Sequence, residues 1–332
     1  MTLPHHLSFP GGASATTPRR APPDRSGGRS LIRAIGLAGA FALAFLAAGP
    51  GRLAAASDPA GAADPATPSG SIATAPAQAP RDLCILTDFF LVGGFAHGQW
   101  LTADEIKPLI RGGEVYRRFS PLAPAGEWVG DPPQAEEGPG EWTRIPARRP
   151  DGGKGEPDGS EAAPADREGL SVSCAWNPFP RPPKAQGLQG KAYLDEVRAR
   201  LRANRLRAEP VVTESFRFDL EGDGTEEVLV IATNADATIP VFRKNTYTLV
   251  LFRRLVAGKV ETTVLHEAYY REDQSGMADS PTGYSFGGVL DLNGDGRLEL
   301  ILRNGYYEGS GVEVHTLEGN RLQLVLSEGV GA

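Results

Sequence analysis

The feature that most constrains the fold of this 332-residue chain is a pair of acidic, glycine-rich stretches in its C-terminal third. They read "DLEGDGTEEV" from residue 219 and "DLNGDGRLEL" from residue 291, so they begin 72 residues apart. Runs rich in alternating apolar residues flank both stretches, which is the pattern of β-strands. A strand–loop–strand unit that occurs twice predicts a mainly β architecture built from repeated units.

Eight strands are expected in this region, in two sets of four, with an acidic loop between the first and second strand of each set. The expected ranges are 211–220, 227–234, 246–255, 259–269, 284–292, 299–307, 311–317 and 321–327. "AGK" at 257–259 and "EGN" at 318–320 are typical of hairpin turns. One amphipathic helix is expected before the strands, at about 189–206, because apolar residues recur there at helical spacing.

Each acidic loop offers oxygen atoms at alternate positions when it is numbered from its first aspartate. Positions 1, 3, 5 and 9 carry side-chain oxygens, and the carbonyl at position 7 can point inward. These residues are Asp219, Glu221, Asp223, Thr225 and Glu227 in the first loop, and Asp291, Asn293, Asp295, Arg297 and Glu299 in the second. Calcium takes six to eight oxygen ligands, and a glycine at position 6 permits the sharp turn. The spacing therefore predicts a calcium ion in each loop.

Two other interpretations of the loops need comparison with calcium binding. The dipeptides Asn-Gly and Asp-Gly also form ordinary hairpin turns, but a turn does not require acids at positions 1, 5 and 9. An EF-hand needs a glutamate at position 12 and a following helix, whereas Val230 and Leu302 stand at that position within expected strands. Without a cation, the crowded carboxylates of the first loop should repel one another, which predicts local disorder there.

The segments "RFDLEGDGTEEVLVI" and "VLDLNGDGRLELIL" resemble the FG-GAP/VCBS-type repeats of integrin-α-like β-propellers, over about 211–332 only. The resemblance implies four-stranded, propeller-blade-like repeats with Asp-rich calcium loops, in which calcium has a structural role. The chain departs from the pattern in showing two repeats and in closing both loops with glutamate rather than aspartate. Two units do not close a propeller. We therefore expect them to pack face to face, to recruit strands from 84–128, or to assemble between chains.

The N-terminal segment, residues 1–56, is typical of an export signal. Five arginines precede an uncharged run at 34–51, and small residues follow at "GRLAAAS". The segment is either a cleaved signal peptide or a signal anchor held in a membrane by residues 31–51. In both cases the bulk of the chain is expected to be extracytoplasmic: secreted, periplasmic or anchored. Contact with a membrane is expected only through this segment, and 57–81 has the composition of a disordered Pro/Ala linker.

Cys84 and Cys174 are the chain's two cysteines, and in an exported protein such a pair is expected to form a disulfide. Residues 82–130 are predicted to form a small α+β module. It would contain a strand at 84–95, a turn at His97-Gly98, a short helix capped by Thr102 or Asp104, and a strand at 114–119. Residues 131–170 return to linker composition and are expected to be disordered. The final unit, 171–332, holds the helix and the repeats.

Composition and motifs limit the classes of function. The net charge of −7 and the pI near 5.4 argue against binding nucleic acid. HExxH and Walker A sequences are absent from the chain. We therefore expect a noncatalytic binding or structural protein with a protein or glycan partner. The alternative is a secreted hydrolase. A cleft that brings together polar groups near His97, the Tyr-Tyr pairs at 269–270 and 306–307 and a perturbed carboxylate would favour it.

Overall fold

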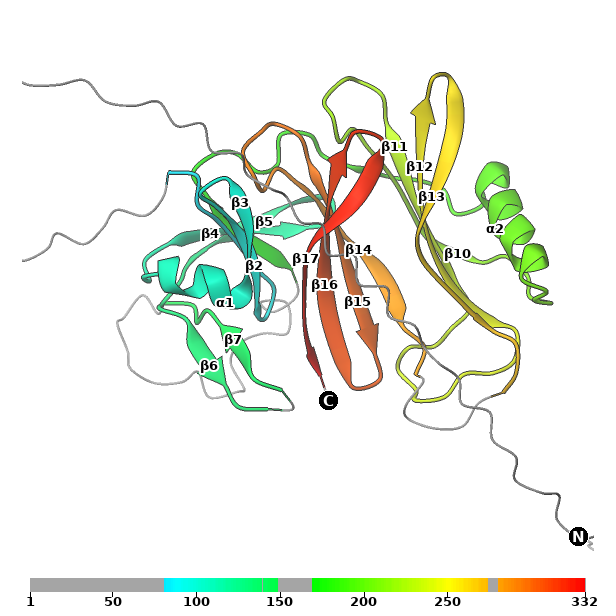
Figure 1. Cartoon of the computed structure of the whole chain (residues 1–332), viewed down its shortest axis with the longest axis horizontal. Coiled ribbons are helices and arrows are strands. Elements are labelled where there is room, and N and C mark those ends of the chain that lie inside the picture. Colours follow the sequence, from blue (N-terminus) through cyan, green and yellow to red (C-terminus); the bar gives the residue numbers. More distant parts are fainter. Residues whose placement is uncertain (1–80, 139, 149–168, 274–279, 332) are drawn as a thin grey trace, which may run out of the picture. The chain divides into compact units, whose positions relative to one another are not determined.

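The computed structural model describes residues 81–138, 140–148, 169–273 and 280–331 (Figure 1). These residues belong to one unit, Ile72–Ala332. The expected export signal and most of the Pro/Ala linker lie outside the described residues, so both stay predictions. Within the described ranges, no helix is long and apolar enough to cross a membrane. The described part is mainly β, as expected, and its antiparallel sheets are open.

The first repeat sheet contains the first four expected strands and one short addition. Its order is β13-β12-β11-β10-β9. The strands are β9 (Lys184–Ala185), β10 (Val212–Phe218), β11 (Glu227–Thr233), β12 (Thr246–Val256) and β13 (Lys259–Tyr270). The helix α2 (Lys191–Ala203) covers one face, where its Val197 and Leu201 pack on a buried cluster that includes Val228 and Val230.

The second repeat sheet contains the other four expected strands, in the order β14-β15-β16-β17. They are β14 (Gly283–Leu290), β15 (Glu299–Tyr306), β16 (Gly309–Glu318) and β17 (Arg321–Gly331). Both expected hairpin turns are confirmed, with Val256 opposite Lys259 and Glu318 opposite Arg321. The first turn places Ala257 and Gly258 at φ of 49° and 77°. Two positive φ values match the right-handed twist of the flanking strands.

The N-terminal sheet has the order β3-β2-β1-β8-β4-β5. Its strands are β1 (Cys84–Thr87), β2 (Leu91–Ala96), β3 (Gln99–Thr102), β4 (Val115–Ser120), β5 (Ala123–Val129) and β8 (Leu170–Cys174). The single strand expected at 84–95 is wrong, because the chain turns at Asp88–Phe90 and makes two. Strand β8 places Cys174 opposite Cys84, and the expected disulfide joins them. The expected helix cap at Thr102 opens α1 (Ala103–Ile106), which continues into η1 (Lys107–Leu109).

The expectation of disorder over 131–170 is wrong for the part that is described. Strands β6 (Gln134–Glu136) and β7 (Trp142–Arg144) form a hairpin. Trp142 anchors it, because its ring meets that of Phe89 edge-on at 5.9 Å and packs on the buried core. One large aromatic residue thus orders a segment whose composition otherwise predicts a linker. Residues 149–168 lie outside the described residues.

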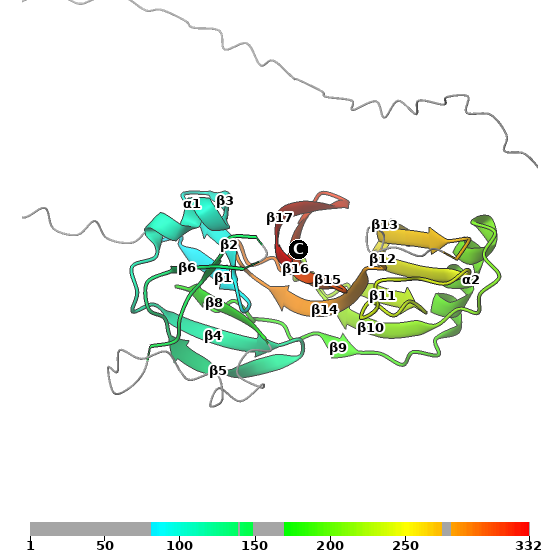
Figure 2. The same ribbon diagram turned by 90° about the horizontal axis from the view of Figure 1, so that it is seen from below.

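The second repeat sheet lies between the other two sheets (Figure 2). One of its faces, with Ile301 and Val314, packs on the N-terminal sheet. Its opposite face, with Leu300 and Leu302, packs on the first repeat sheet. The repeats thus stack on each other and also recruit strands from the N-terminal module.

The two repeat sheets stack in the same sense. Val228 and Leu300 hold the same position in the repeat, yet Val228 faces α2 while Leu300 faces the first repeat sheet. Leu229 and Ile301 are likewise equivalent, and Leu229 faces the second repeat sheet while Ile301 faces the N-terminal sheet. If the faces that carry Val228 and Leu300 are called the fronts, the back of the first repeat sheet packs on the front of the second. The back of the second repeat sheet packs on the N-terminal sheet.

Candidate metal centre and a tyrosine-lined cavity

The two acidic loops share one backbone scaffold. Asp219 accepts hydrogen bonds from the N–H groups of Gly222 and Gly224, at 2.7 and 3.0 Å. Asp291 accepts the equivalent bonds from Gly294 and Gly296, at 2.7 and 3.1 Å. The four glycines have φ between 74° and 83°, a conformation that other residues seldom adopt. The aspartate at position 1 therefore organises the loop by itself, before any cation is considered.

The closing glutamates brace the loops from beneath. Glu227 accepts a hydrogen bond from the Leu220 N–H at 3.0 Å, and Glu299 accepts one from the Leu292 N–H at 2.8 Å. The second carboxylate oxygen of Glu299 accepts the Thr316 hydroxyl at 3.2 Å, and the side chain is fully buried. Burial raises the pKa of Glu299 to about 8, and the neighbouring loop aspartates add to that rise. The structure therefore places Glu299 as a buried brace.

The two loops lie against each other and form one joint. The Leu298 N–H donates to the Leu220 carbonyl at 2.9 Å. Arg181 spans both loops, because its guanidinium donates to the carbonyls of Asp219 and Leu220 and also to that of Gly296. This arginine lies in the segment between β8 and α2. The sequence carries no local sign of this role.

Trp176, from the same segment, covers the second loop. Its indole N–H donates to the Asp291 carbonyl at 2.8 Å. Its ring lies so near Gly294 that a Cβ there would come within 3.3 Å of it. The first half of the second loop therefore packs against an aromatic side chain, while Asn293 is half-buried and Asp295 is exposed.

Arginine and lysine side chains pair with two glutamates of the first loop. Both oxygens of Glu221, at position 3, are held by guanidinium groups, from Arg254 at 2.7 Å and from Arg297 at 2.8 Å. Glu226 pairs with Lys184 at 2.6 Å. Arg297 stands at position 7 of the second loop, so one loop supplies a counter-charge to the other. These pairs reduce the repulsion from which disorder of the first loop was expected.

The second loop has different partners. Asn293 accepts the Asp295 N–H at 3.0 Å and donates its amide to the Asp295 carboxylate at 3.2 Å. The other oxygen of Asp295 accepts the Arg297 N–H at 2.8 Å. Within the described ranges, no lysine or arginine side chain forms an ion pair with Asp291 or Asp295. Neither aspartate is thus held in an ion pair, although the nearby charge of Arg181 favours the ionised form of Asp291 and so lowers its pKa.

The donor atoms of the second loop fit calcium better than those of the first. Asp291, Asn293 and Asp295 supply hard oxygen ligands on one curled loop, and the Arg297 carbonyl is a fourth. Glu299 is engaged below the loop, so water would complete the coordination. In the first loop, two guanidinium groups hold both oxygens of Glu221, so position 3 has no free oxygen to offer to calcium. Nowhere in the described part are three or more His, Cys, Asp or Glu side chains grouped to hold a metal.

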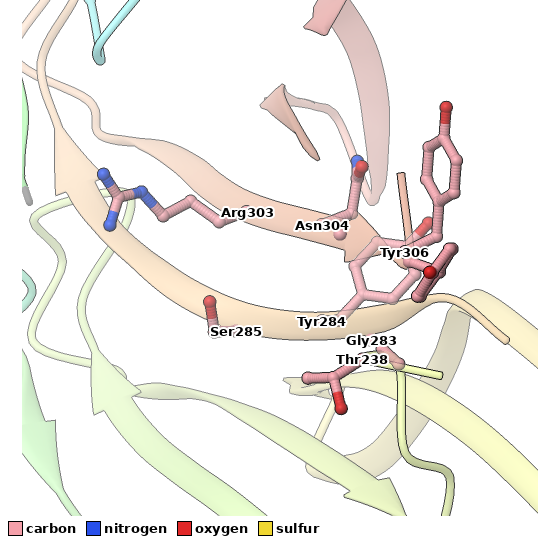
Figure 3. Close-up of a pocket in the computed structure, with 10 residues that line it drawn as sticks. Thr238, Gly283, Tyr284, Ser285, Arg303, Asn304 and Tyr306 are labelled. Atoms are coloured by element: carbon pink, nitrogen blue, oxygen red, sulfur yellow. The ribbon is translucent and has the colours of Figure 1, made fainter. Parts of the chain in front are cut away.

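A cavity of about 460 Å³ lies at the far end of β14 and β15 (Figure 3). Figure 3 shows Tyr284, Asn304 and Tyr306 gathered at one end of it and Arg303 at the other. Tyr307 lines it too and is exposed. Arg303 is paired with the buried carboxylate of Asp88. The open surface is thus aromatic and polar, with its one lining cation already neutralised by a partner.

A polar network lies behind the tyrosines. Glu313 accepts hydrogen bonds from the Tyr284 hydroxyl at 3.2 Å and the Asn304 amide at 3.1 Å, and its other oxygen lies 3.2 Å from His315 Nε2. Burial raises the pKa of Glu313, but hydrogen bonds and the charge of His315 outweigh that effect and leave the pKa below its usual value. This carboxylate is a candidate that sequence reasoning missed. Glu313 and His315 alternate on one face of β16, which was the available signal.

The histidines divide between this network and the surface. His266 packs its ring on Tyr284, with centroids 4.5 Å apart, and burial lowers the pKa of its imidazole. His315 is buried on β16 beside Glu313. His97 lies exposed in the expected turn. No polar cluster forms around His97 among the described contacts.

Comparison of the chain with protein-family models, curated proteins and solved structures gives no match.

Proposed function

We propose that this chain is a noncatalytic, extracytoplasmic binding or structural module in which calcium rigidifies the second acidic loop. One contrast carries the proposal. The two loops share a scaffold, but guanidinium groups hold both oxygens of Glu221 at position 3 of the first loop, whereas no ion pair among the described residues involves Asp291 or Asp295 of the second. The resemblance to FG-GAP/VCBS-type repeats supports the same conclusion, because such repeats hold structural calcium at this position between the first two strands.

The ligands in this proposal are the side chains of Asp291, Asn293 and Asp295, the carbonyl of Arg297 and water. Calcium supplies positive charge that offsets the repulsion between the loop aspartates. Glu299 orients the loop from below. In the first loop, Arg254 and Arg297 take the role of the cation, so we propose one calcium ion rather than the two that the spacing alone predicts.

Propeller-blade-like stacking is the architectural part of the proposal. It is supported by the front-to-back order of the two repeat sheets and by the acidic loop between the first two strands of each. Calcium at the joint would fix the angle at which the second loop meets Trp176 and Arg181. The ion would then stabilise the stack and have no part in a reaction.

Calorimetry of the full-length chain with calcium and with a chelator tests this proposal. We expect calcium to raise the melting temperature, because a 100-fold excess over Kd adds about 2.7 kcal/mol to the free energy of unfolding. D295N should abolish the rise. D223N changes the same position in the first loop and should keep it. A wild-type melting temperature that calcium leaves unchanged, or equal losses in both variants, would refute calcium at the second loop.

A second candidate function is glycan binding at the tyrosine-lined cavity. Tyrosines 284, 306 and 307 supply flat apolar faces, and Ser285, Asn304 and Thr238 supply neutral polar groups. Such a lining suits an uncharged, polyhydroxylated ring, which has one apolar face and many hydroxyls. Glu313 is held by three donors behind the tyrosines, with a pKa that keeps it ionised. This arrangement favours binding over general-acid catalysis and hence over the hydrolase.

A glycan array followed by calorimetric titration tests the second candidate. We expect Y307A to weaken binding and L324A to leave it unchanged, since Leu324 is equally exposed on the same sheet but away from the cavity. Oligosaccharides that bind should be recovered intact. Cleavage that Y307A or a Glu313 variant abolishes would instead support the hydrolase.

A further inference from the structure

A second cavity, of about 570 Å³, lies on the α2 side of the first repeat sheet. Strands β10, β11 and β12 form its floor, and the first turn of α2 forms one wall. Basic side chains dominate its polar lining: Lys191, Arg217, Arg253 and Arg254. The acidic side chain in the lining is Glu226. A basic cavity is unexpected in a chain of net charge −7.

The strand register explains why these cations gather. Lys184 lies opposite Arg217, Arg217 opposite Val228, and Val228 opposite Arg253. Residues that oppose one another across neighbouring strands point to the same face. One row across four strands therefore carries three cations and one valine. The remainder of this face is apolar and buried under α2.

Two of the arginines in the cavity have no carboxylate partner among the residues that the structure describes. Lys184 pairs with Glu226, and Arg254 pairs with Glu221. Lys191 pairs with Asp195. Arg217, by contrast, donates to the Tyr193 hydroxyl at 3.3 Å, and the Arg253 guanidinium lies 5.5 Å from the centre of the Tyr193 ring. The Nε atom of Arg253 is buried and makes no hydrogen bond to any described residue.

Partly buried guanidinium groups without a counter-ion are costly in free energy. Here two of them flank one aromatic ring on the floor of an open cavity. A guanidinium presents its donors in a planar fork that matches the oxygens of phosphate and sulfate. A compact oxyanion placed between Arg217 and Arg253 would supply the missing charge and the missing acceptors.

We propose that this cavity binds a phosphate or sulfate group, either as the free ion or as the ester of a larger ligand. The two arginines are the recognition residues, and Tyr193 holds them apart through its hydroxyl and its ring. The cavity borders the first acidic loop through Thr225 and Glu226, but no residue of the second loop or of the tyrosine-lined cavity lines it. It is thus a further site and does not depend on calcium.

Isothermal titration of the full-length chain with inorganic phosphate and with sulfate, at constant ionic strength set by chloride, tests the proposal. We expect saturable binding of at least one anion and a matching rise in melting temperature. R253Q should weaken binding by about tenfold or more. R202Q is the matched control, because Arg202 is exposed on α2 outside the cavity and loses the same charge. R202Q should bind as the wild type does.

Two further variants keep the test decisive. R253K retains the charge but loses the planar fork, so it should bind more weakly than the wild type while folding normally. D295N should bind phosphate normally, which separates this site from the calcium proposal. Tighter binding of glucose 6-phosphate than of inorganic phosphate would identify an ester ligand, and equal binding would identify the free ion. Absence of saturable binding, or equal weakening by R253Q and R202Q, overturns the proposal.

Discussion

The first and second acidic loops make the same turns with different counter-charges. In both, the aspartate at position 1 gathers the glycine N–H groups and the glutamate at position 9 braces the loop from below. Position 3 separates them. Glu221 binds two arginines, whereas Asn293 binds its own loop. The difference at position 3 shows that one residue can change the partners of a loop while its backbone hydrogen bonds stay the same.

The largest effect should come from removing the brace. E299A leaves the Leu292 N–H and the Thr316 hydroxyl without a partner in a fully buried place, so it should lower the free energy of unfolding by about 3 kcal/mol. E227A should cost less, about 2 kcal/mol, because Glu227 accepts only from backbone. Urea denaturation at pH 7 measures both.

E299Q is the control for that comparison. Because burial raises the pKa of Glu299 to about 8, the side chain is largely protonated at pH 7, and glutamine provides the same acceptor and donor. E299Q should therefore change stability by less than about 1 kcal/mol. A cost as large as that of E299A would show that Glu299 stabilises the loop as a charged carboxylate.

The next effect should come from Glu221. E221A leaves the Arg254 side chain, which is 10 % exposed, without its carboxylate. Because Glu221 itself is partly exposed, we expect a cost of about 2 kcal/mol, below the range for fully buried pairs. E226A is the matched control in the same loop, since its partner Lys184 is 68 % exposed, and it should cost under about 0.5 kcal/mol. Equal costs for E221A and E226A in urea denaturation would contradict a stabilising role for the pairs that Glu221 forms with Arg254 and Arg297.

A smaller effect is expected from R297A, which tests whether one residue serves both loops. Its side chain is 38 % exposed, so losing the pair with Glu221 should cost less than about 1 kcal/mol. Its carbonyl remains in the second loop. The rise in melting temperature on adding calcium should therefore persist in R297A, as measured by calorimetry. If the rise disappears while the fold is intact, the arginine side chain is part of calcium binding and the two loops are more closely coupled than we propose.

The smallest effect should appear at the opposite end of the stack, at His266. Burial lowers the pKa of this histidine, so the unfolded chain binds its proton more readily than the folded chain. Stability should therefore fall as pH drops from 7 through the unfolded value near 6.5. H266F should reduce this slope, whereas E221A should keep it. Melting temperatures recorded between pH 7.5 and 5.5 would show whether the two ends of the stack respond separately.

Local patterns predicted the C-terminal half of the fold well. Alternation and turn dipeptides determine where a strand starts and ends, so all eight expected strands formed near their expected ranges. The acidic loops formed between the expected strands for the same reason. Strand ends and turns depend on residues that are neighbours in the sequence, so a single sequence is enough to predict them.

Features that depend on distant residues were not predictable in the same way. Arg254 reaches the first loop because β12 pairs with β11, and Arg297 reaches it because the two repeat sheets stack. The residues near position 219 do not predict either contact. The hairpin at 134–144 was missed because a composition rich in Pro, Gly and charge outweighed one informative residue, Trp142. The network around Glu313 joins strands from both repeat sheets, so it exists only after they pack.

The position of β8 in the N-terminal sheet has a consequence for the order of folding. Strands β1 and β4 each pair with β8 on one side, so that sheet cannot be completed until residues 170–174 have emerged. Until then, both strands present unpaired backbone edges to other chains. Closing a contact across 90 residues is slow as well. A chain truncated before β8 should aggregate, and a holding chaperone would be most useful during that interval.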